Sequence, residues 1–344
     1  MGRFDHYDED SFTARPGRRG SRPRSKDRPS HDDAEIGQVI AVDRGRYTTR
    51  VDGRVVIAMR AREVGRHRIV VGDQVAMVGD TTGEVDTLAR IVRVLDRRSV
   101  LRRSADDSDR VERVIVANAT HLAIVTALAD PEPRPRMIDR CLVAAYDAGL
   151  EPILVLTKAD LADPTDLTLQ YEALSVPSVA ISLNQDRGEA QTGAAVTDQG
   201  GLADLRRRLA GNLTVLVGHS GVGKSTLVNA LVPTAQRAVG VVNDVTGRGR
   251  HTSTSAVALP LVDGGWVVDT PGVRSFGLGH VDPATFVEHF DDLAAGAADC
   301  PRGCSHDEPD CALDSYVTSG AAGRGGAVRL ESLRRLLRSR TDPV

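Results

Sequence analysis

Residues 213–231 read LTVLVGHSGVGKSTLVNAL, and they indicate the fold class of the domain around them. A β-branched apolar run is followed by a glycine-rich loop and then by helical spacing, which predicts strand, loop and helix in that order. The loop matches in full the G-x-x-x-x-G-K-S pattern that binds phosphate. The matching residues are Gly218, His219, Ser220, Gly221, Val222, Gly223, Lys224 and Ser225.

Each part of this loop has a chemical task. Glycines let backbone N–H groups approach phosphate oxygens, and the amino end of the helix adds partial positive charge. We expect Lys224 to reach the β- and γ-phosphates, Ser225 to offer its hydroxyl to Mg²⁺ and Thr226 to bond the α-phosphate. The chain keeps only three lysines among 44 basic residues, which indicates that Lys224 needs its compact ammonium. The alternative is a glycine-rich turn before an ordinary helix.

Two further segments are candidates for holding Mg²⁺ and the γ-phosphate. Asp269 follows the strand pattern GGWVV and begins Asp-Thr-Pro-Gly. Its carboxylate is expected to hold Mg²⁺, usually through water, and the Gly272 N–H to reach the γ-phosphate. The polar loop 249–254 supplies hydroxyls, and we assign Thr252 to the Mg²⁺ shell, with Ser253 as second choice. Taken alone, the first segment is a common turn and the second a plain polar loop.

A base-reading turn is predicted where the strand pattern PILVL ends. The residues there are Thr157, Lys158, Ala159 and Asp160. In GTPases the aspartate of this turn accepts hydrogen bonds from the ring N1–H and the exocyclic amine of guanine, a donor pair that adenine lacks. The lysine stem packs on the base. The next strand pattern, VPSVAIS, leads to Ser182 and Leu183, which we expect to contact the base as well.

The order of these motifs is unusual. In Ras-like GTPases the phosphate loop precedes the guanine turn, whereas here residues 157–160 precede 218–226, which precede 269–272. Strand and helix patterns alternate from residue 111 onward, which predicts a parallel sheet covered by helices. A doubly wound sheet tolerates this circular permutation because binding depends on which loops meet at the strand ends. Residues 184–211 can join the former termini.

The chain in front of this domain has a different pattern. Residues 36–103 contain short Val/Ile-rich runs separated by glycine and aspartate, which predicts a five-stranded barrel of the OB type or the SH3-like type. They carry fourteen basic and eight acidic residues, whereas residues 104–344 carry 22 and 31. A basic front module indicates a polyanionic partner such as RNA. Its shortage of aromatic residues favours phosphate contacts over base stacking.

The first 35 residues have the composition of a disordered arm, rich in Arg, Asp, Ser, Pro and Gly. The arm is either a solvated tail or an electrostatic contact to RNA. Its charged start lacks a signal-peptide core, and no apolar run in the chain approaches the roughly 20 residues of a membrane span. We therefore expect a cytoplasmic location.

The cysteines argue for a metal site rather than a disulfide scaffold. Cys300, Cys304 and Cys311 lie within twelve residues, and His306 lies among them. Three thiolates and one imidazole make a closed tetrahedral zinc set, which would hold together a small C-terminal helical module. The alternative is three reduced cysteines and a surface histidine. Cys141 lies apart on an apolar helix face and is expected in the core.

Together these features resemble the ribosome small subunit-dependent GTPase A family of circularly permuted bacterial GTPases. The resemblance covers about residues 36–320 and rests on a front barrel, TKAD, GHSGVGKST, GRHT, DTPGVR and a Cys/His cluster, in that order. It implies GTP hydrolysis stimulated by the 30S subunit, a role in late 30S maturation, and binding and release of 16S rRNA according to the nucleotide state. We further expect a monomer without a membrane or DNA partner, using GTP or GDP with Mg²⁺ and one structural Zn²⁺.

The resemblance divides the chain into four parts: a disordered basic arm (1–35), an OB-type RNA-binding barrel (36–103), a circularly permuted α/β P-loop GTPase domain (104–275) and a helical zinc-binding domain (276–344). Two other classes stay open. A kinase or ATPase with the same phosphate loop would show no guanine preference. An RNA-binding module could bind nucleotide without hydrolysing it.

The chain departs from these families at two places that bear on the chemistry. Thr157 replaces the usual asparagine of the guanine turn and so loses an amide that braces neighbouring loops; we expect modestly weaker binding, with guanine selection kept by Asp160. Val273 stands where Ras-like enzymes carry a water-orienting glutamine, so intrinsic turnover should be slow. We assign catalysis to Lys224 and to His251, which would position water; the alternative for His251 is a hydrogen bond within its own loop.

Overall fold

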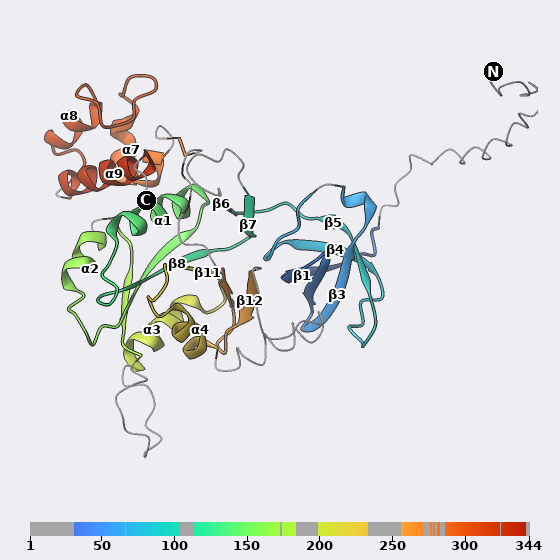
Figure 1. The fold of residues 1–344 in the computed structure, drawn as a ribbon. Helices are drawn as coiled ribbons and strands as arrows, with labels where there is room; N and C mark the ends of the chain where they lie inside the picture. The colour runs from blue at the N-terminus through green and yellow to red at the C-terminus, as the bar shows by residue number, and fades with distance from the viewer. Residues whose placement is uncertain are drawn as a thin grey trace, which may run out of the picture. The chain divides into compact units, whose positions relative to one another are not determined.

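A computed structural model describes residues 31–341, with gaps at 66, 104–112, 173, 184–198, 233–255, 271–275, 277, 279–280, 283–285 and 324 (Figure 1). Most of the arm (1–35) lies outside these residues. The expectations for His251, Thr252 and Gly272 also fall outside them, as does Val273.

The first five strands close into a barrel. They are β1 (Glu35–Asp43), β2 (Arg46–Val51), β3 (Arg54–Arg60), β4 (Gln74–Gly79) and β5 (Ala89–Val94), with a short 3₁₀ helix, η2 (Arg62–Val64), after β3. The order around the barrel is β1-β2-β3-β5-β4 and back to β1, with β3 and β5 parallel and the other pairs antiparallel. This order is that of an OB-type barrel, so the structure confirms the first of the two predicted barrel types.

A two-stranded ribbon connects the barrel to the next domain. It consists of β6 (Val100–Arg103) and β7 (Arg113–Ala117), which pair antiparallel. The barrel turn before β4 lies against the end of β7, where the Ala117 N–H donates to Val71 O at 2.9 Å and Asn118 Nδ2 donates to Gly72 O at 2.9 Å. Gly72 has φ +89°, and a Cβ there would overlap the Ala117 carbonyl, so this close approach requires glycine.

Six strands form the sheet of the central domain. They are β8 (His121–Ala127), β9 (Glu151–Thr157), β10 (Ser178–Ile181), β11 (Leu213–Val217), β12 (Val257–Pro260) and β13 (Trp266–Asp269). Their order is β10-β9-β8-β11-β13-β12. All neighbours are parallel except β12, which runs antiparallel to β13 and also pairs with β1 of the barrel. The predicted parallel sheet is confirmed, and the carboxyl ends of its five parallel strands share one edge.

Helices cover both faces of this sheet (Figure 1). The helices are α1 (Pro135–Asp147), α2 (Thr165–Glu172), α3 (Gln199–Leu209) and α4 (Lys224–Leu231). Alternation along β8 explains the two layers: Leu122 and Ile124 belong to the core that includes α1, whereas Ala123 and Val125 belong to the core that includes α3 and α4. Both faces are apolar because both are covered by helices.

The C-terminal module is helical. It contains η3 (Val287–His289), α7 (Asp291–Ala297), α8 (Ala312–Thr318) and α9 (Gly326–Thr341). Its buried residues are part of the same core as α1, and Arg335 Nε of α9 donates to Asp139 Oδ2 of α1 at 3.0 Å. Among the described residues, no helix is long and apolar enough to cross a membrane.

Candidate active site and metal centre

The phosphate-binding loop lies at the carboxyl edge of the central sheet, between β11 and α4. Gly221 and Gly223 have φ +85° and +84°, and Gly223 is the N-cap of α4. A Cβ on Gly218 would overlap the carbonyl oxygen of Val125, the neighbouring residue on β8. The three glycines are therefore required by the backbone path of the loop. Ser225 and Thr226 follow in the first turn of α4, exposed and half-buried respectively.

The loop lysine meets the predicted magnesium carboxylate. Lys224 Nζ donates to Asp269 Oδ1 at 2.8 Å. The two residues meet because β11, which leads into the phosphate loop, runs parallel to β13, with Leu216 aligned with Asp269. The Lys224 side chain is 16% exposed, so the pair is partly shielded from water. A cation suited to phosphate and a carboxylate suited to a divalent cation thus converge on one point.

The guanine turn follows β9 and touches the phosphate loop directly. Thr157 is 4% exposed, and its Oγ1 lies 2.6 Å from Val222 O and 3.2 Å from Thr126 O. Because a hydroxyl has one proton, the shorter contact is the donated hydrogen bond. Thr157 therefore links the base-reading turn to the phosphate loop through its hydroxyl, although it lacks the amide of the usual asparagine.

Ala159 and Asp160 of the guanine turn pair with the end of β10 and the turn that follows it. Ser182 Oγ donates to Asp160 Oδ1 at 2.7 Å, and the Ala159 N–H donates to Ile181 O at 3.3 Å. Leu183 packs against the core that includes α3 and α4. The structure thus brings together the two turns that were predicted to form the base site.

Sequence reasoning missed the turn that follows β8. Lys158 Nζ donates to the carbonyl of Asp130 in this turn. The neighbouring Pro131 would lie 3.5 Å from a Cβ on Gly221, so the turn also borders the phosphate loop. The signal in the sequence was its proline-rich composition, which marks a turn but no chemistry. His219 of the phosphate loop is buried, with Nδ1 2.9 Å from Ser220 O.

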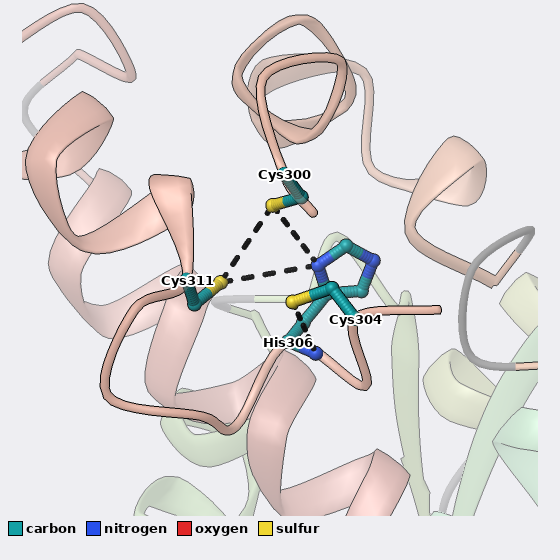
Figure 2. A group of neighbouring side chains, drawn as sticks. All are labelled: Cys300, Cys304, His306 and Cys311. Carbon is teal, nitrogen blue, oxygen red and sulfur yellow. Dashed lines mark hydrogen bonds between the residues drawn. The ribbon is translucent and has the colours of Figure 1, made fainter. Parts of the chain in front are cut away.

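The four predicted zinc ligands come together in the C-terminal module (Figure 2). Cys300 Sγ lies 3.8 Å from Cys311 Sγ and 3.6 Å from His306 Nδ1, and all four ligand atoms lie within 4.8 Å of one another. Zinc bonds of about 2.3 Å to sulfur and 2.0 Å to nitrogen place tetrahedral ligands about 3.5–3.8 Å apart. The donor set and spacing therefore fit one Zn²⁺.

Side chains around the cluster fix its loop. Arg334 Nε of α9 donates to His306 O at 2.8 Å, and Arg338 forms two hydrogen bonds to Asp307 at 2.7 and 2.8 Å. Burial raises the pKa of the Cys304 thiol to about 12. A thiol in this environment becomes a thiolate only beside a cation, which is the role that a bound metal ion fills.

The barrel, the permuted sheet with its complete phosphate loop and the Cys₃His cluster together define a circularly permuted P-loop GTPase. The chain belongs to the RsgA GTPase family, whose sequence profile matches residues 94–279. Curated relatives include the small ribosomal subunit biogenesis GTPase RsgA of Ectopseudomonas mendocina (strain ymp), 39% identical over 79% of this chain and 75% of that protein. The protein of that name from Azotobacter vinelandii (strain DJ / ATCC BAA-1303) is 37% identical over 80% and 76%.

Solved structures have the same architecture. The crystal structure of YjeQ from Thermotoga maritima aligns with TM-score 0.63 at 26% identity, covering 90% of this chain and 99% of that one. YloQ, described as a circularly permuted GTPase, aligns with TM-score 0.61 at 22% identity, covering 92% and 100%. The family resemblance inferred from the motifs is confirmed, and so is the enzyme class. The protein is a GTPase. This assignment excludes both alternatives, a kinase or ATPase and an RNA-binding module that does not hydrolyse nucleotide.

Proposed function

We propose that this GTPase acts in late maturation of the small ribosomal subunit. The 30S subunit stimulates its turnover, and the nucleotide state sets its binding to and release from 16S rRNA. The names of its relatives support the partner, and its basic barrel supports contact with RNA phosphates. We assign RNA binding to residues 36–103, GTP hydrolysis to 104–275 and the zinc module to 276–344. The protein acts as a cytoplasmic monomer without a membrane or DNA partner.

One observation carries the proposed GTP site. The hydrogen bond from Thr157 Oγ1 to Val222 O joins the base-reading turn to the phosphate loop, although 65 residues separate them and their order is permuted. Asp160, held by Ser182, accepts the guanine donors. The backbone N–H groups of 218–223 hold the phosphates, and Thr226 bonds the α-phosphate. One nucleotide thus spans both loops.

The proposed reaction is in-line attack of water on the γ-phosphate. Lys224 exchanges its contact with Asp269 for the β- and γ-phosphate oxygens, where it stabilises the charge that develops. Asp269, Ser225 and Thr252 would hold Mg²⁺, which would supply positive charge to neutralise the phosphates. The Gly272 N–H reaches the γ-phosphate. His251 positions the attacking water, because Val273 has no group for this task.

The test is the rate of GTP hydrolysis with and without purified 30S and 50S subunits, at two salt concentrations. We expect slow turnover alone and stimulation by 30S only, weaker at the higher salt concentration because phosphate contacts are screened. Equal stimulation by both subunits would contradict the proposed partner. The residue assignments are tested separately: Asp160→Asn should shift preference from GTP to xanthosine triphosphate, and unchanged preference would contradict the base site.

A second test concerns the histidine. His251→Ala should abolish most 30S-stimulated turnover while GTP binding is kept, since the residue is proposed to act on water and not on nucleotide. Stimulated turnover that survives in this variant, with binding intact, would remove the histidine from the mechanism.

A further inference from the structure

A buried arginine in the middle of α1 joins two distant segments of the chain. Arg140 is 2% exposed. Its Nη1 donates to Ser339 O and its Nη2 donates to Phe276 O, each at 2.7 Å. These partners are 199 and 136 residues away in the sequence, and they belong to the C-terminal helix and to the segment after the Asp269 turn. One guanidinium therefore holds both segments on the central domain.

The Phe276 contact lies close in the chain to the proposed nucleotide site. Phe276 is the seventh residue after Asp269, and its side chain is 1% exposed in the core that includes α1. Its carbonyl is an anchoring point for the chain that leaves the Asp269 turn. Only six residues of sequence separate this carbonyl from Asp269.

The Ser339 contact lies at the end of α9. The last carbonyls of a helix lack intrahelical partners, and a cation there also interacts favourably with the helix dipole. Arg140 supplies both a donor and a positive charge at this buried end. The same helix braces the metal cluster, since Arg334 donates to His306 O at 2.8 Å. The end of α9 and the metal module are thus parts of one connected element.

We propose that Arg140 is a positioning residue that couples the nucleotide state of the central domain to α9 and the metal module. This inference rests on the proposed function of the Asp269 turn. The guanidinium is a planar fork with fixed donor directions, so its two short hydrogen bonds constrain both carbonyls together. If Phe276 O moves, a buried charge loses an acceptor, which is costly, and the end of α9 must shift with it. The position of the metal module then depends on which nucleotide is bound.

A neighbouring contact provides a matched control. Arg335 of α9 also reaches α1, donating to Asp139 Oδ2 at 3.0 Å and Oδ1 at 3.3 Å, and its guanidinium lies over the Tyr171 ring. It ties the same two helices together without a hydrogen bond to Phe276. Removing Arg335 therefore loosens α9, whereas removing Arg140 also cuts the connection to the segment that follows Asp269.

The experiment is amide hydrogen exchange of the full-length, zinc-loaded protein with GDP or with guanosine 5′-(β,γ-imido)triphosphate. In the wild-type protein, exchange at residues 333–341 should differ between the two nucleotides by about fivefold or more. Arg140→Met keeps the apolar stem and removes the donors, so the difference should disappear. Arg335→Met should speed exchange in both states and keep the difference. Absence of any difference in the wild-type protein, or its persistence in Arg140→Met, overturns the proposal.

Folding and nucleotide binding are checked in parallel. Zinc content and far-ultraviolet circular dichroism show whether Arg140→Met is folded. If it is not, Arg140→Lys is used instead, because lysine keeps the buried charge but lacks the planar fork. In that variant too, the exchange difference between the two nucleotides should disappear. Titration with a fluorescent guanine nucleotide separates the two levels of inference. A wild-type protein that does not bind nucleotide contradicts the proposed function, whereas binding without a response of α9 contradicts only the coupling.

Discussion

At the scale of single residues, the guanine turn shows how one substitution is accommodated. The asparagine usual at position 157 is replaced by threonine, which is shorter and has no amide. Thr157 nevertheless reaches Val222 O at 2.6 Å because the phosphate loop approaches closely. At this position the threonine hydroxyl makes the hydrogen bond between the loops, although an asparagine amide is more common there.

The first prediction concerns this hydroxyl. Thr157→Val keeps the shape of the side chain but leaves the buried Val222 carbonyl without its donor, a loss of about 1–2 kcal/mol. We expect the affinity for GTP and GDP to fall about tenfold, since 1.4 kcal/mol corresponds to a factor of ten. Fluorescent nucleotide titration measures it. Thr157→Ser is the control and should bind almost as the wild-type protein does; equal affinities of the valine and serine variants would refute the brace.

At the scale of elements, the phosphate loop depends on the neighbouring strand. Gly218→Ala should abolish GTP binding, because its Cβ would overlap the Val125 carbonyl and displace the loop. Gly325 is the matched control, since a Cβ there meets no atom within 4 Å. Gly325→Ala should bind GTP normally. Isothermal calorimetry on both variants checks the prediction, and wild-type affinity in Gly218→Ala would contradict it.

The metal module provides a second prediction at this scale. The short helices α7 and α8 have seven residues each, too few to be stable without tertiary contacts. Cys311→Ser should reduce bound zinc from one per chain to almost none and lower the thermal unfolding midpoint. Cys141→Ala, which removes a buried cysteine that is not part of the cluster, should keep the zinc. Metal analysis by mass spectrometry distinguishes the two, and full zinc content in Cys311→Ser would exclude it as a ligand.

Three short elements were not recognised from the sequence, although β10 and β13, which have four residues each, were recognised as strands. β6 and β12 have four residues each, and α2 has eight with only Tyr171 buried, so none shows a clear periodicity. By contrast, the sequence indicated a helix around Cys141 because its apolar residues recur at helical spacing, and the structure buries nine of the thirteen residues of α1. Pattern strength therefore determined which elements the sequence revealed.

At the scale of the whole molecule, the barrel presents a candidate surface for RNA. Met59 of β3 is 42% exposed, and the register places it between Arg46 of β2 and Arg90 of β5, both exposed. Neighbouring strands are about 4.8 Å apart, so these three side chains form a row across the barrel. Two cations flanking an apolar side chain suit contacts with a phosphate backbone.

The last prediction tests this row. Arg46→Ala and Arg90→Ala should each weaken binding to the 30S subunit and reduce the slope of log affinity against log salt by about one, as expected for the loss of one phosphate contact. Arg54→Ala is the control, because Arg54 is already paired with Glu35 at 3.2 Å on the same barrel. Filter binding at several salt concentrations measures the slopes. Unchanged slopes for Arg46→Ala and Arg90→Ala, or an equal loss for Arg54→Ala, would place the RNA elsewhere.

The local chemistry of this protein could be predicted from its amino-acid sequence. The phosphate loop, the guanine turn and the metal ligands were predicted because each depends on residues close together in the chain. The barrel was predicted because short Val/Ile-rich runs repeat along residues 36–103. Contacts between these segments, by contrast, depend on the folded arrangement of strands and helices. The contacts of Thr157 with Val222, Lys158 with Asp130 and Arg140 with Phe276 join residues 65, 28 and 136 positions apart. Such pairs have no local signature, because strand order and helix packing bring them together only after the chain has folded.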